Sequence, residues 1–283
     1  MDATISVITP VYKGNTFLPI LLNYLLDAAS KVKEVQIEWI LINDYPHEEL
    51  TKLTSSISNF KIRVINNKHN IGIHASRING LKHASGKYVL FLDQDDKVLP
   101  QIFKYHLNMI KGFDVSLSNG FNEMNQTYKP IFKNLSQMKK IGKISTFFYV
   151  GNMIVSPGMA LIRKNAIPQE WISNELSING ADDWLLWTTL LKNKAKFNFG
   201  DVKLYYHIKT GNNASDNIKK MVESSIEANN IYNVRYPEDK KKCGVYKRRL
   251  KMWVNISIKS KNKIVQYILN PDILLYMLFI KVM

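Results

Sequence analysis

The chain has 283 residues, of which 46% are hydrophobic and 11% aromatic. This composition excludes a disordered protein and is typical of a packed globular one. The length allows one large α/β domain or a domain with an appendage. The formal net charge of +16 indicates a polyanionic partner, and nucleic acid, anionic lipid and diphosphate-bearing molecules all qualify. The single cysteine, Cys243, excludes an intramolecular disulfide framework and suits a reducing compartment.

Short β-rich runs alternate with helical patterns through the first 120 residues. Strands are predicted at residues 5–9, 37–43, 62–66, 88–92 and 115–118, and helices at residues 16–29, 47–58, 73–84 and 100–111. This order predicts an α/β protein with a mostly parallel sheet and helices on both faces. Because the first strand starts almost at once, we expect no cleavable secretion signal. No apolar stretch reaches about 18 residues, so a conventional membrane-spanning helix is not expected either.

The strand predicted at residues 88–92 runs directly into three carboxylates, Asp93, Asp95 and Asp96. Ligands of open parallel sheets bind just beyond the carboxyl ends of such strands. Side chains two positions apart in an extended segment point the same way, so Asp93 and Asp95 project together and repel each other unless a cation lies between them. A divalent cation that carries phosphates fits this need. The structural alternative is a solvated acidic turn that caps the helix after Leu99-Pro100.

The pattern weakens between residues 121 and 155, which indicates loops or short strands beside a groove. A strand at residues 159–163, a helix at 182–194 and a strand at 202–206 follow. The helix opens with Asp182 and Asp183, and carboxylates in a first turn are often there only because they favour the helix dipole. Trp184 and Trp187 lie in the same helix; either could be an apolar platform, and the helical spacing favours a core position for Trp187.

The C-terminal segment, residues 216–283, is predicted to be helical, basic and apolar. Clustered Lys and Arg side chains precede two apolar runs, residues 264–269 and 273–280, which Asn270-Pro271 separates. Basic clusters beside apolar helices suit the surface of an anionic bilayer. We therefore expect residues 240–283 to contact an anionic membrane surface. The alternative is a helical hairpin that packs on the rest of the chain or on a second subunit, with its lysines solvated.

Six short motifs in the first hundred residues together resemble the inverting glycosyltransferases of family 2, which have the GT-A fold. They are Ser6-Val7-Ile8-Thr9-Pro10-Val11-Tyr12, Asn43-Asp44, Asn70-Ile71-Gly72, Arg77-Ile78-Asn79-Gly80-Leu81, Ala84-Ser85-Gly86-Lys87-Tyr88 and Phe91-Leu92-Asp93-Gln94-Asp95-Asp96. The resemblance is tight over these residues and continues loosely to about residue 215. It implies a Rossmann-like GT-A domain at residues 1–215, with a nucleotide-sugar-binding half at 1–120 and an acceptor and catalytic half at 121–215, followed by the helical tail.

The resemblance also implies roles for single residues of a nucleotide-sugar site. A nucleoside-diphosphate sugar, with a UDP-sugar favoured, is expected to contact Pro10, Tyr12, Asp44, Asn70, Arg77, Asp93, Gln94 and Lys209. A surface salt bridge is the alternative role for Arg77. The turn after Asp44 departs from the family, because Tyr45-Pro46 stands where Gly-Ser is usual, and Ile78 replaces a common Asn.

Metal and catalytic residues follow from the same resemblance. Asp95 is the expected direct ligand of Mn²⁺ or Mg²⁺, with Asp93 toward the ribose or the metal, and the cation would neutralise the departing diphosphate. Asp183 is expected to be the general base that deprotonates an acceptor hydroxyl, and Asp182 to orient that base or hold an acceptor hydroxyl. The segment from Tyr205 to Ser215 corresponds to one that often supplies a metal-binding His, and either His207 or Lys209 occupies that position.

These implications predict an inverting glycosyltransferase that acts on a glycan acceptor, such as a lipid-linked glycan, in bacterial surface polysaccharide synthesis. We expect a cytoplasmic protein, peripheral on the inner face of the cell membrane, and an oligomer is possible. A binding or scaffolding module that has lost turnover is the alternative. Nucleic acid is not expected as a partner, because no RNA-binding signature or basic–aromatic ribbon is present. A two-metal phosphohydrolase would need more ligands, and a dinucleotide dehydrogenase would need a glycine fingerprint after the first strand.

Overall fold

A computed structural model describes residues 4–209 and 216–282 of the chain. The chain forms two compact units, each assembled from three separate stretches. Unit 1 consists of residues 1–132, 155–167 and 195–210, and unit 2 of residues 133–154, 168–194 and 211–283. The expected boundary near residue 215 stays a prediction.

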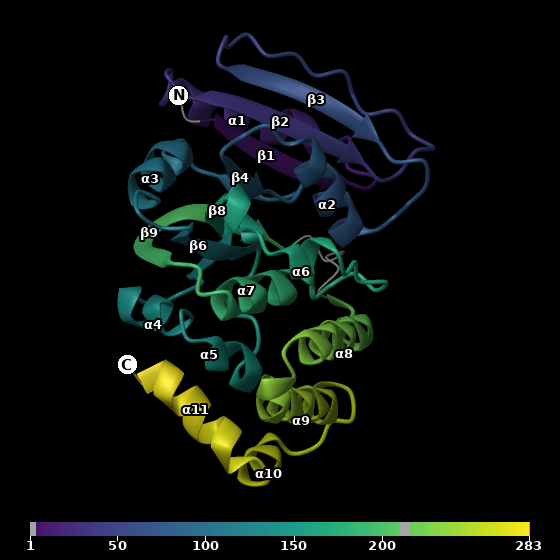
Figure 1. The fold of residues 1–283 in the computed structure, drawn as a ribbon, viewed down its shortest axis with the longest axis vertical. Helices are drawn as coiled ribbons and strands as arrows, with labels where there is room; N and C mark the ends of the chain where they lie inside the picture. The colour runs from purple at the N-terminus through teal and green to yellow at the C-terminus, as the bar shows by residue number, and fades with distance from the viewer. Residues whose placement is uncertain (1–3, 210–215, 283) are drawn as a thin grey trace. The chain divides into compact units, whose positions relative to one another are not determined.

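The described strands of unit 1 form a nine-stranded sheet (Figure 1). Its path is β3-β2-β1-β4-β8-β6-β9-β5, and β7 pairs with β6 off that path. The α/β class is confirmed. The pairs β1–β2, β2–β3, β1–β4 and β6–β9 are parallel, whereas β8, β7 and β5 make antiparallel pairs. The strand bounds are β1 Thr4–Val11, β2 Gln36–Asn43, β3 Phe60–Asn66, β4 Tyr88–Phe91, β5 Lys97–Val98, β6 Val115–Met124, β7 Thr127–Pro130, β8 Ala160–Arg163 and β9 Phe197–Ile208.

Strands β1, β2 and β4 are buried on both faces, as their continuous apolar runs predict. Because the three strands are parallel neighbours, their carboxyl ends lie at one edge of the sheet. The segments that leave this edge carry Tyr12, Asp44 and Asp93. The sheet thereby gathers residues that are up to 81 positions apart in sequence.

Helices α2 (Ile73–His83) and α3 (Ile102–Met109) lie within the ranges that the sequence predicts, and α1 (Leu18–Ser30) ends one residue beyond its predicted range. Helix α2 packs on β1 and β2. Its Gly80 allows this approach, because a Cβ there would lie 2.3 Å from Ile8 Cγ2. The short 3-10 turns η1 (Pro157–Met159) and η2 (Lys164–Ala166) flank β8.

The helix predicted at residues 47–58 is wrong, since residues 49–57 form no regular element. Pro46 precedes the segment, and Asn15 fixes its start from another part of the chain. The Asn15 amide donates to Glu48 Oε1 and to the Glu49 carbonyl, and its Oδ1 accepts from Thr51 N at 2.8 Å. These tertiary hydrogen bonds override a helical pattern that contains few strong helix formers after Leu53.

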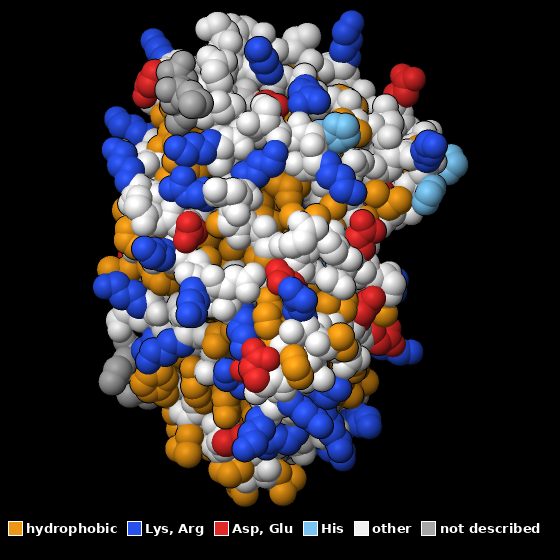
Figure 2. Space-filling model, viewed as in Figure 1, with side chains coloured by type: hydrophobic (Ala, Val, Ile, Leu, Met, Phe, Trp, Pro, Cys, Tyr) orange, Lys and Arg blue, Asp and Glu red, His pale blue; other side chains and the backbone are white. Residues whose placement is uncertain are grey.

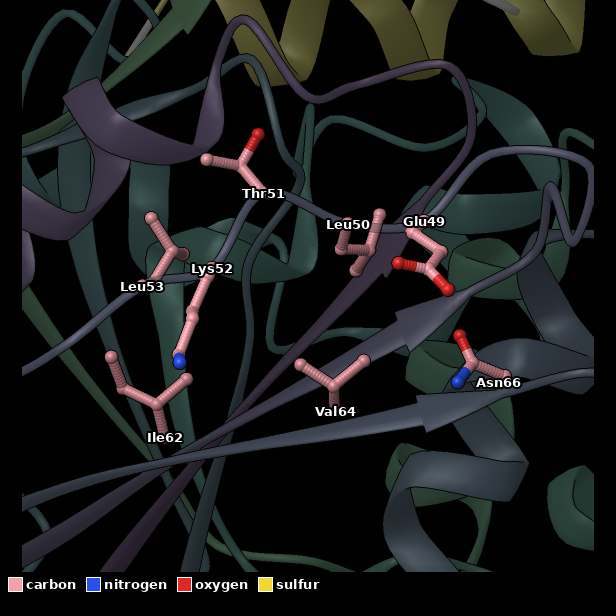
Figure 3. Close-up of a pocket in the computed structure, with 8 residues that line it drawn as sticks. All are labelled: Glu49, Leu50, Thr51, Lys52, Leu53, Ile62, Val64 and Asn66. Carbon is pink, nitrogen blue, oxygen red and sulfur yellow. The ribbon is translucent and has the colours of Figure 1, made fainter.

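A hollow of about 320 Å³ lies between this irregular segment and the edge strand β3 (Figure 3). Leu50, Ile62 and Val64 point into it from its two sides. Its other lining residues are Glu49, Thr51, Lys52, Leu53 and Asn66. None of the eight lining residues is one of the expected site residues.

Unit 2 is helical in its described part (Figure 1). Its core contains Trp184 stacked on Tyr246, with ring centroids 4.6 Å apart, and Phe148 and Tyr232 pack edge-on against Trp184. Trp184 and Trp187 are both buried. Neither can therefore be an exposed apolar platform, and both belong to the core. The helices are α4 Leu135–Lys140, α5 Ile144–Tyr149, α6 Gln169–Ile172, α7 Asp182–Lys192, α8 Ile218–Arg235, the 3-10 turn η4 Pro237–Asp239, α9 Lys240–Ser257, α10 Lys263–Ile268 and α11 Pro271–Val282.

The helical character predicted for the C-terminal segment is confirmed, because α8 to α11 occupy most of residues 218–282. Across the described part of the chain, no helix combines the length and apolarity that crossing a bilayer requires.

Candidate active site

Asp93 is the first carboxylate beyond β4, and it lies between two donors. Arg77 Nη2 donates to Asp93 Oδ1 at 2.5 Å, and Ser156 Oγ donates to Oδ2 at 3.1 Å. The Arg77 side chain is only 4% exposed, so the alternative of a surface salt bridge is wrong. The buried guanidinium therefore balances the charge of Asp93 and fixes the position of that carboxylate.

Asp95 has a different environment. No other side chain in the described ranges gives its carboxylate a hydrogen bond or ion pair. Burial, together with the neighbouring charges of Asp96 and Asp93, raises the pKa of Asp95 to about 7. A half-buried carboxylate with a raised pKa and like charges beside it is one that a cation would stabilise in its charged form.

Asp96 is the innermost carboxylate and is 3% exposed. It accepts a hydrogen bond from the Tyr205 hydroxyl, and its Oδ1 accepts one from Ile208 N at 3.1 Å. His207 Nδ1 lies 3.3 Å from the same Oδ1. All three partners belong to the end of β9, so Asp96 fixes this strand end beside the acidic segment.

His207 turns its Nδ1 toward this carboxylate. Burial works against its protonation, but Asp96, Asp93 and Asp95 outweigh burial and raise the pKa of His207. A carboxylate on Nδ1 leaves Nε2 as the ring nitrogen available to a ligand, which is the usual arrangement behind a metal-binding His. Lys209, the alternative residue, is exposed just beyond the strand, and its backbone N–H donates to the Glu123 carbonyl. The rest of the predicted segment, residues 210–215, lies outside the described residues.

Gln94 joins the acidic segment to the segment after β1. Its Oε1 accepts from Tyr12 N at 3.0 Å, and its Nε2 donates to the Tyr12 carbonyl at 3.1 Å. The Tyr12 ring is 46% exposed and packs edge-on against Tyr45, and Lys13 Nζ lies over both rings. The loop therefore offers an aromatic surface next to Pro10, at the end of β1.

Asp44 is buried and organises the loop before α2. Its Oδ1 accepts from Asn67 Nδ2 and from Ile71 N, both at 2.8 Å, and its Oδ2 accepts from Gly72 N at 2.9 Å. Asn70 Oδ1 also accepts from Gly72 N. Both expected nucleotide ligands thus shape the same turn, whose Gly72 has a φ of 86°.

In unit 2, Asp182 and Asp183 form the first turn of α7. Asp182 is 3% exposed, whereas Asp183 is half-buried. Asn152 Nδ2 donates to Asp183 Oδ2 at 2.7 Å, and Trp184 N donates to Oδ1 at 2.7 Å. A partly exposed carboxylate whose two oxygens are positioned in this way can serve as a general base.

The residues present fit a divalent cation that is bound partly by the protein and partly by its ligand's phosphates. In the described ranges, no three His, Cys, Asp or Glu side chains form a ready-made metal cage. Mg²⁺ and Mn²⁺ do not require one, because they bind through one or two carboxylates together with phosphate oxygens and water. Asp95 is suited to that mode, and Asp93 and His207 lie beside it.

Three organising residues could not be found from the sequence. Ser156 caps η1 and donates to Asp93, Tyr205 donates to Asp96, and Asn152 holds Asp183. Ser156 and Tyr205 come from chain segments far from the acidic motif. The one available signal was the Tyr-Tyr-His run before Ile208, where alternation in a strand places Tyr205 and His207 on the same face.

The sequence matches the family model described as glycosyl transferase family 2 over residues 6–170. The chain belongs to this family. The match includes the acidic segment after β4 and ends before α7, so it covers the expected nucleotide and metal residues from Pro10 to Asp95 but not His207 or Lys209.

Several curated glycosyltransferases are similar to this family 2 chain. An uncharacterized glycosyltransferase of Rickettsia felis is 25% identical over 205 residues, which cover 67% of this chain and 30% of that protein. The chain therefore spans less than a third of that relative. The UDP-Glc:alpha-D-GlcNAc-diphosphoundecaprenol beta-1,3-glucosyltransferase WfgD of Escherichia coli is 22% identical over 225 residues, with 78% of this chain and 83% of WfgD covered.

Solved structures support the GT-A fold for this family 2 chain. TarS residues 1–349 of S. aureus, in complex with UDP-GlcNAc, superimpose with a TM-score of 0.62 at 20% identity, covering 91% of this chain and 73% of that one. The mannosyltransferase PcManGT from Pyrobaculum calidifontis, in complex with GDP-Man and Mn²⁺, gives a TM-score of 0.57 at 10% identity, covering 98% and 81%.

Proposed function

We propose that this protein is an inverting glycosyltransferase that moves a sugar from a nucleoside-diphosphate sugar to a hydroxyl group of a glycan acceptor. The observation that carries the proposal is the edge of the sheet beyond β4. There burial and the neighbouring acids raise the pKa of Asp95, Asp93 is paired with the buried Arg77, and His207 Nδ1 lies 3.3 Å from Asp96 Oδ1. Family membership supports the same reaction class.

The donor would bind across the carboxyl ends of β1, β2 and β4, where α/β sheets bind their ligands. Pro10, Tyr12, Asp44 and Asn70 would form the nucleoside side of this site, with the Tyr12 ring against the base. Arg77 and Lys209 would supply positive charge to the diphosphate. The TarS complex with UDP-GlcNAc supports a UDP-sugar as the donor.

Asp95, with Asp93 and His207 beside it, would hold Mn²⁺ or Mg²⁺, and the bound cation would neutralise the diphosphate leaving group. The PcManGT complex with Mn²⁺ supports this assignment. The role of the protein is to keep the ligands in place. Arg77 and Ser156 position Asp93, and Asp96 positions the His207 ring.

Asp183 would be the general base. Direct displacement at the anomeric carbon requires a carboxylate facing the incoming hydroxyl, on the side opposite the leaving group. Asn152 and the Trp184 N–H fix the two Asp183 oxygens, and Asp182 behind them would orient the base or bind an acceptor hydroxyl. The hydroxyl proton would pass to Asp183, and the product would have the inverted anomeric configuration.

The acceptor would be a glycan, such as a lipid-linked one, in the synthesis of a bacterial surface polysaccharide. The name of WfgD, whose acceptor is a diphosphoundecaprenol-linked GlcNAc, supports this substrate class. We further propose that the protein works in the cytoplasm at the inner face of the cell membrane. The concentration of basic side chains in residues 240–283 supports that location.

Donor binding tests the proposal directly. A panel of nucleoside-diphosphate sugars is screened by thermal stabilisation with and without Mn²⁺, and the best ligand is measured by calorimetry. We expect metal-dependent binding that Asp95→Ala abolishes and that Asp27→Ala, at an exposed acid on α1, leaves unchanged. Equal stabilisation by every nucleotide without metal would contradict the proposal.

Turnover separates an enzyme from a binding module. Hydrolysis or transfer of the bound donor is followed by nucleotide release, and the product anomer is assigned by NMR. We expect Asp183→Asn to abolish transfer while donor affinity stays within about twofold, because the base does not hold the nucleotide. A wild-type protein that binds its donor but neither hydrolyses nor transfers it would favour the scaffolding alternative.

A further inference from the structure

Helix α10 is inverted relative to an ordinary surface helix. Its polar Gln266 points inward and is 7% exposed, and Gln266 Oε1 accepts from Asn255 Nδ2 of α9 at 2.8 Å. Its apolar side chains point outward: Ile264 is 69% exposed, Ile268 66% and the following Leu269 67%. A helix on a water-facing surface shows the opposite pattern.

The apolar surface continues on both sides of α10. On α11, Leu275, Leu278 and Phe279 are exposed at positions i, i+3 and i+4 and so share one side of the helix. The opposite side of α11 is already occupied, because Ile273 and Ile280 are buried and Tyr276 stacks on Tyr149 of α5. We call the exposed set the C-terminal apolar face; it comprises Ile258, Ile264, Val265, Ile268, Leu269, Leu275, Leu278 and Phe279.

Positive charge surrounds this face. Residues 240–283 contain eleven Lys and Arg side chains and one acid, Asp272, so they carry ten of the sixteen net charges of the chain. Asp272 is paired with Arg248 at 2.5 Å. Lys259, Lys261 and Lys263 are exposed between Ile258 and Ile264, within the face itself. In Figure 2, apolar and basic side chains lie next to each other over α9 to α11.

We propose that α10 and the outer side of α11 dock on an anionic phospholipid bilayer, with the C-terminal apolar face inserted at the acyl boundary and Lys259, Lys261 and Lys263 at the headgroups. This inference rests on the proposed function, because a lipid-linked acceptor would be presented at such a surface. The proposed docking surface is smaller than the membrane contact that the sequence predicts for all of residues 240–283. The apolar side chains Tyr246, Leu250 and Met252 of α9 are buried in unit 2, so α9 can contribute basic residues but little apolar surface.

The charge of the segment decides between a bilayer and a second copy of the chain. In a twofold-symmetric contact the same patch faces itself, so exposed lysines on one copy would lie against those on the other. Only one carboxylate is present in residues 240–283 to compensate them, and it is already paired. Anionic headgroups provide the missing negative charge, whereas a second copy does not.

Vesicle co-sedimentation of the full chain tests the proposal. The probes are phosphatidylcholine vesicles with and without phosphatidylglycerol, at low and high salt. The apolar variant carries Ile264→Ser, Ile268→Ser and Leu269→Ser, and the charge variant carries Lys259→Gln, Lys261→Gln and Lys263→Gln. Two matched controls change residues outside the face, at Ile20, Ile226 and Val234 to Ser, and at Lys33, Lys52 and Lys82 to Gln.

We expect wild-type protein to bind only the anionic vesicles and to be released by salt. The charge variant should bind roughly a hundredfold more weakly, at about 1 kcal/mol for each basic residue near the surface. The apolar variant should lose retention at high salt as well, because insertion is less sensitive to screening than surface attraction. Both control variants should bind like wild type.

Equal binding of the apolar variant and its control would overturn the proposal. So would a concentration-dependent dimer in sedimentation velocity that the apolar variant abolishes without any effect on vesicle binding. Nucleotide affinity of all variants is measured in parallel without vesicles. If the wild type binds nucleotide but does not bind vesicles, the docking inference fails and the proposed glycosyltransferase function stands.

Discussion

Gln94 and Tyr12 are joined by two hydrogen bonds between one side chain and one backbone unit. Gln94 Oε1 accepts from Tyr12 N at 3.0 Å, and Gln94 Nε2 donates to the Tyr12 carbonyl at 3.1 Å. Both polar atoms of the amide are used, so Gln94 acts in this structure as a positioning residue. It ties the aromatic loop after β1 to the acidic segment that carries Asp95.

Gln94→Ala should therefore weaken binding of the nucleoside while leaving the diphosphate contact largely intact. We expect a roughly tenfold loss in affinity for UDP with Mn²⁺, since two neutral hydrogen bonds contribute about 0.5–1.5 kcal/mol each and water replaces them in part. Affinity for inorganic pyrophosphate with Mn²⁺ should change by less than about twofold. Calorimetry measures both, with Gln101→Ala at an exposed position as the control. Equal losses for UDP and pyrophosphate would show that Gln94 contacts the diphosphate instead.

Gly14→Ala should reproduce the effect of Gln94→Ala. A Cβ on Gly14 would lie 2.0 Å from Gln94 Oε1, so the Gln94 amide must move away from Tyr12. Because both changes break the same contact, the double variant should bind UDP no more weakly than either single one. Gly244→Ala, where a Cβ meets no atom within 4 Å, is the control. Additive losses in the double variant would mean that the two residues act independently.

Asn152→Ala should lower turnover without affecting donor affinity. The Asn152 amide donates to Asp183 Oδ2 at 2.7 Å, and a hydrogen bond to a charged group contributes about 1.5–3 kcal/mol. We expect donor turnover to fall roughly tenfold to hundredfold, with UDP affinity unchanged and a shift in the pH profile of the rate. Asn230→Ala, at an exposed position on α8, controls for the loss of an amide. An unchanged pH profile would argue against an effect through Asp183.

Because of Asp239, the stability of unit 2 should fall at low pH. Its carboxylate binds Lys192 of α7, Lys242 of α9 and the Tyr232 hydroxyl of α8, at 2.7 to 2.8 Å. Burial opposes ionisation, but these hydrogen bonds outweigh it and lower the pKa of Asp239 to about 2. Since an unfolded Asp has a pKa near 3.9, the stabilisation is present above that value and is lost as the pH falls toward 2.

Asp239→Asn should therefore lower Tm by roughly 5 °C at neutral pH, and the gap to wild type should shrink as the pH falls below about 4. Differential scanning calorimetry at a series of pH values measures this gap. Asp27→Asn, in an exposed pair with Lys31, should change Tm by less than about 2 °C. A gap that stays constant down to low pH would contradict the assignment.

The parallel half of the sheet could be predicted from the sequence because each strand is a continuous apolar run. Both faces of these strands are buried, as at Ile5, Val7, Ile8 and residues 88–91. A short, uninterrupted apolar run is therefore enough to identify each strand. The segment at residues 49–57 could not be predicted, because hydrogen bonds from the distant Asn15 decide its conformation. Local propensity carries no information about such partners.

The candidate site divides in the same way. Asp95 and Arg77 can be recognised from their motifs, but the burial of Arg77 and the raised pKa of Asp95 cannot be predicted from them. Both properties depend on how the surrounding chain packs. Ser156 and Asn152 belong to no motif, and Tyr205 begins a segment that was singled out for His207 and Lys209; the hydrogen bonds of all three to the acids depend on the fold.

The stacking of Trp184 on Tyr246 has a consequence for experiments that shorten the chain. Tyr246 lies on α9, and Trp184 follows Asp183 directly in α7. A truncation designed to remove only the lipid-facing end, if cut ahead of α9, would also strip the aromatic support from behind the proposed base. Truncated variants intended to make the protein easier to handle should retain α9 through Ser257.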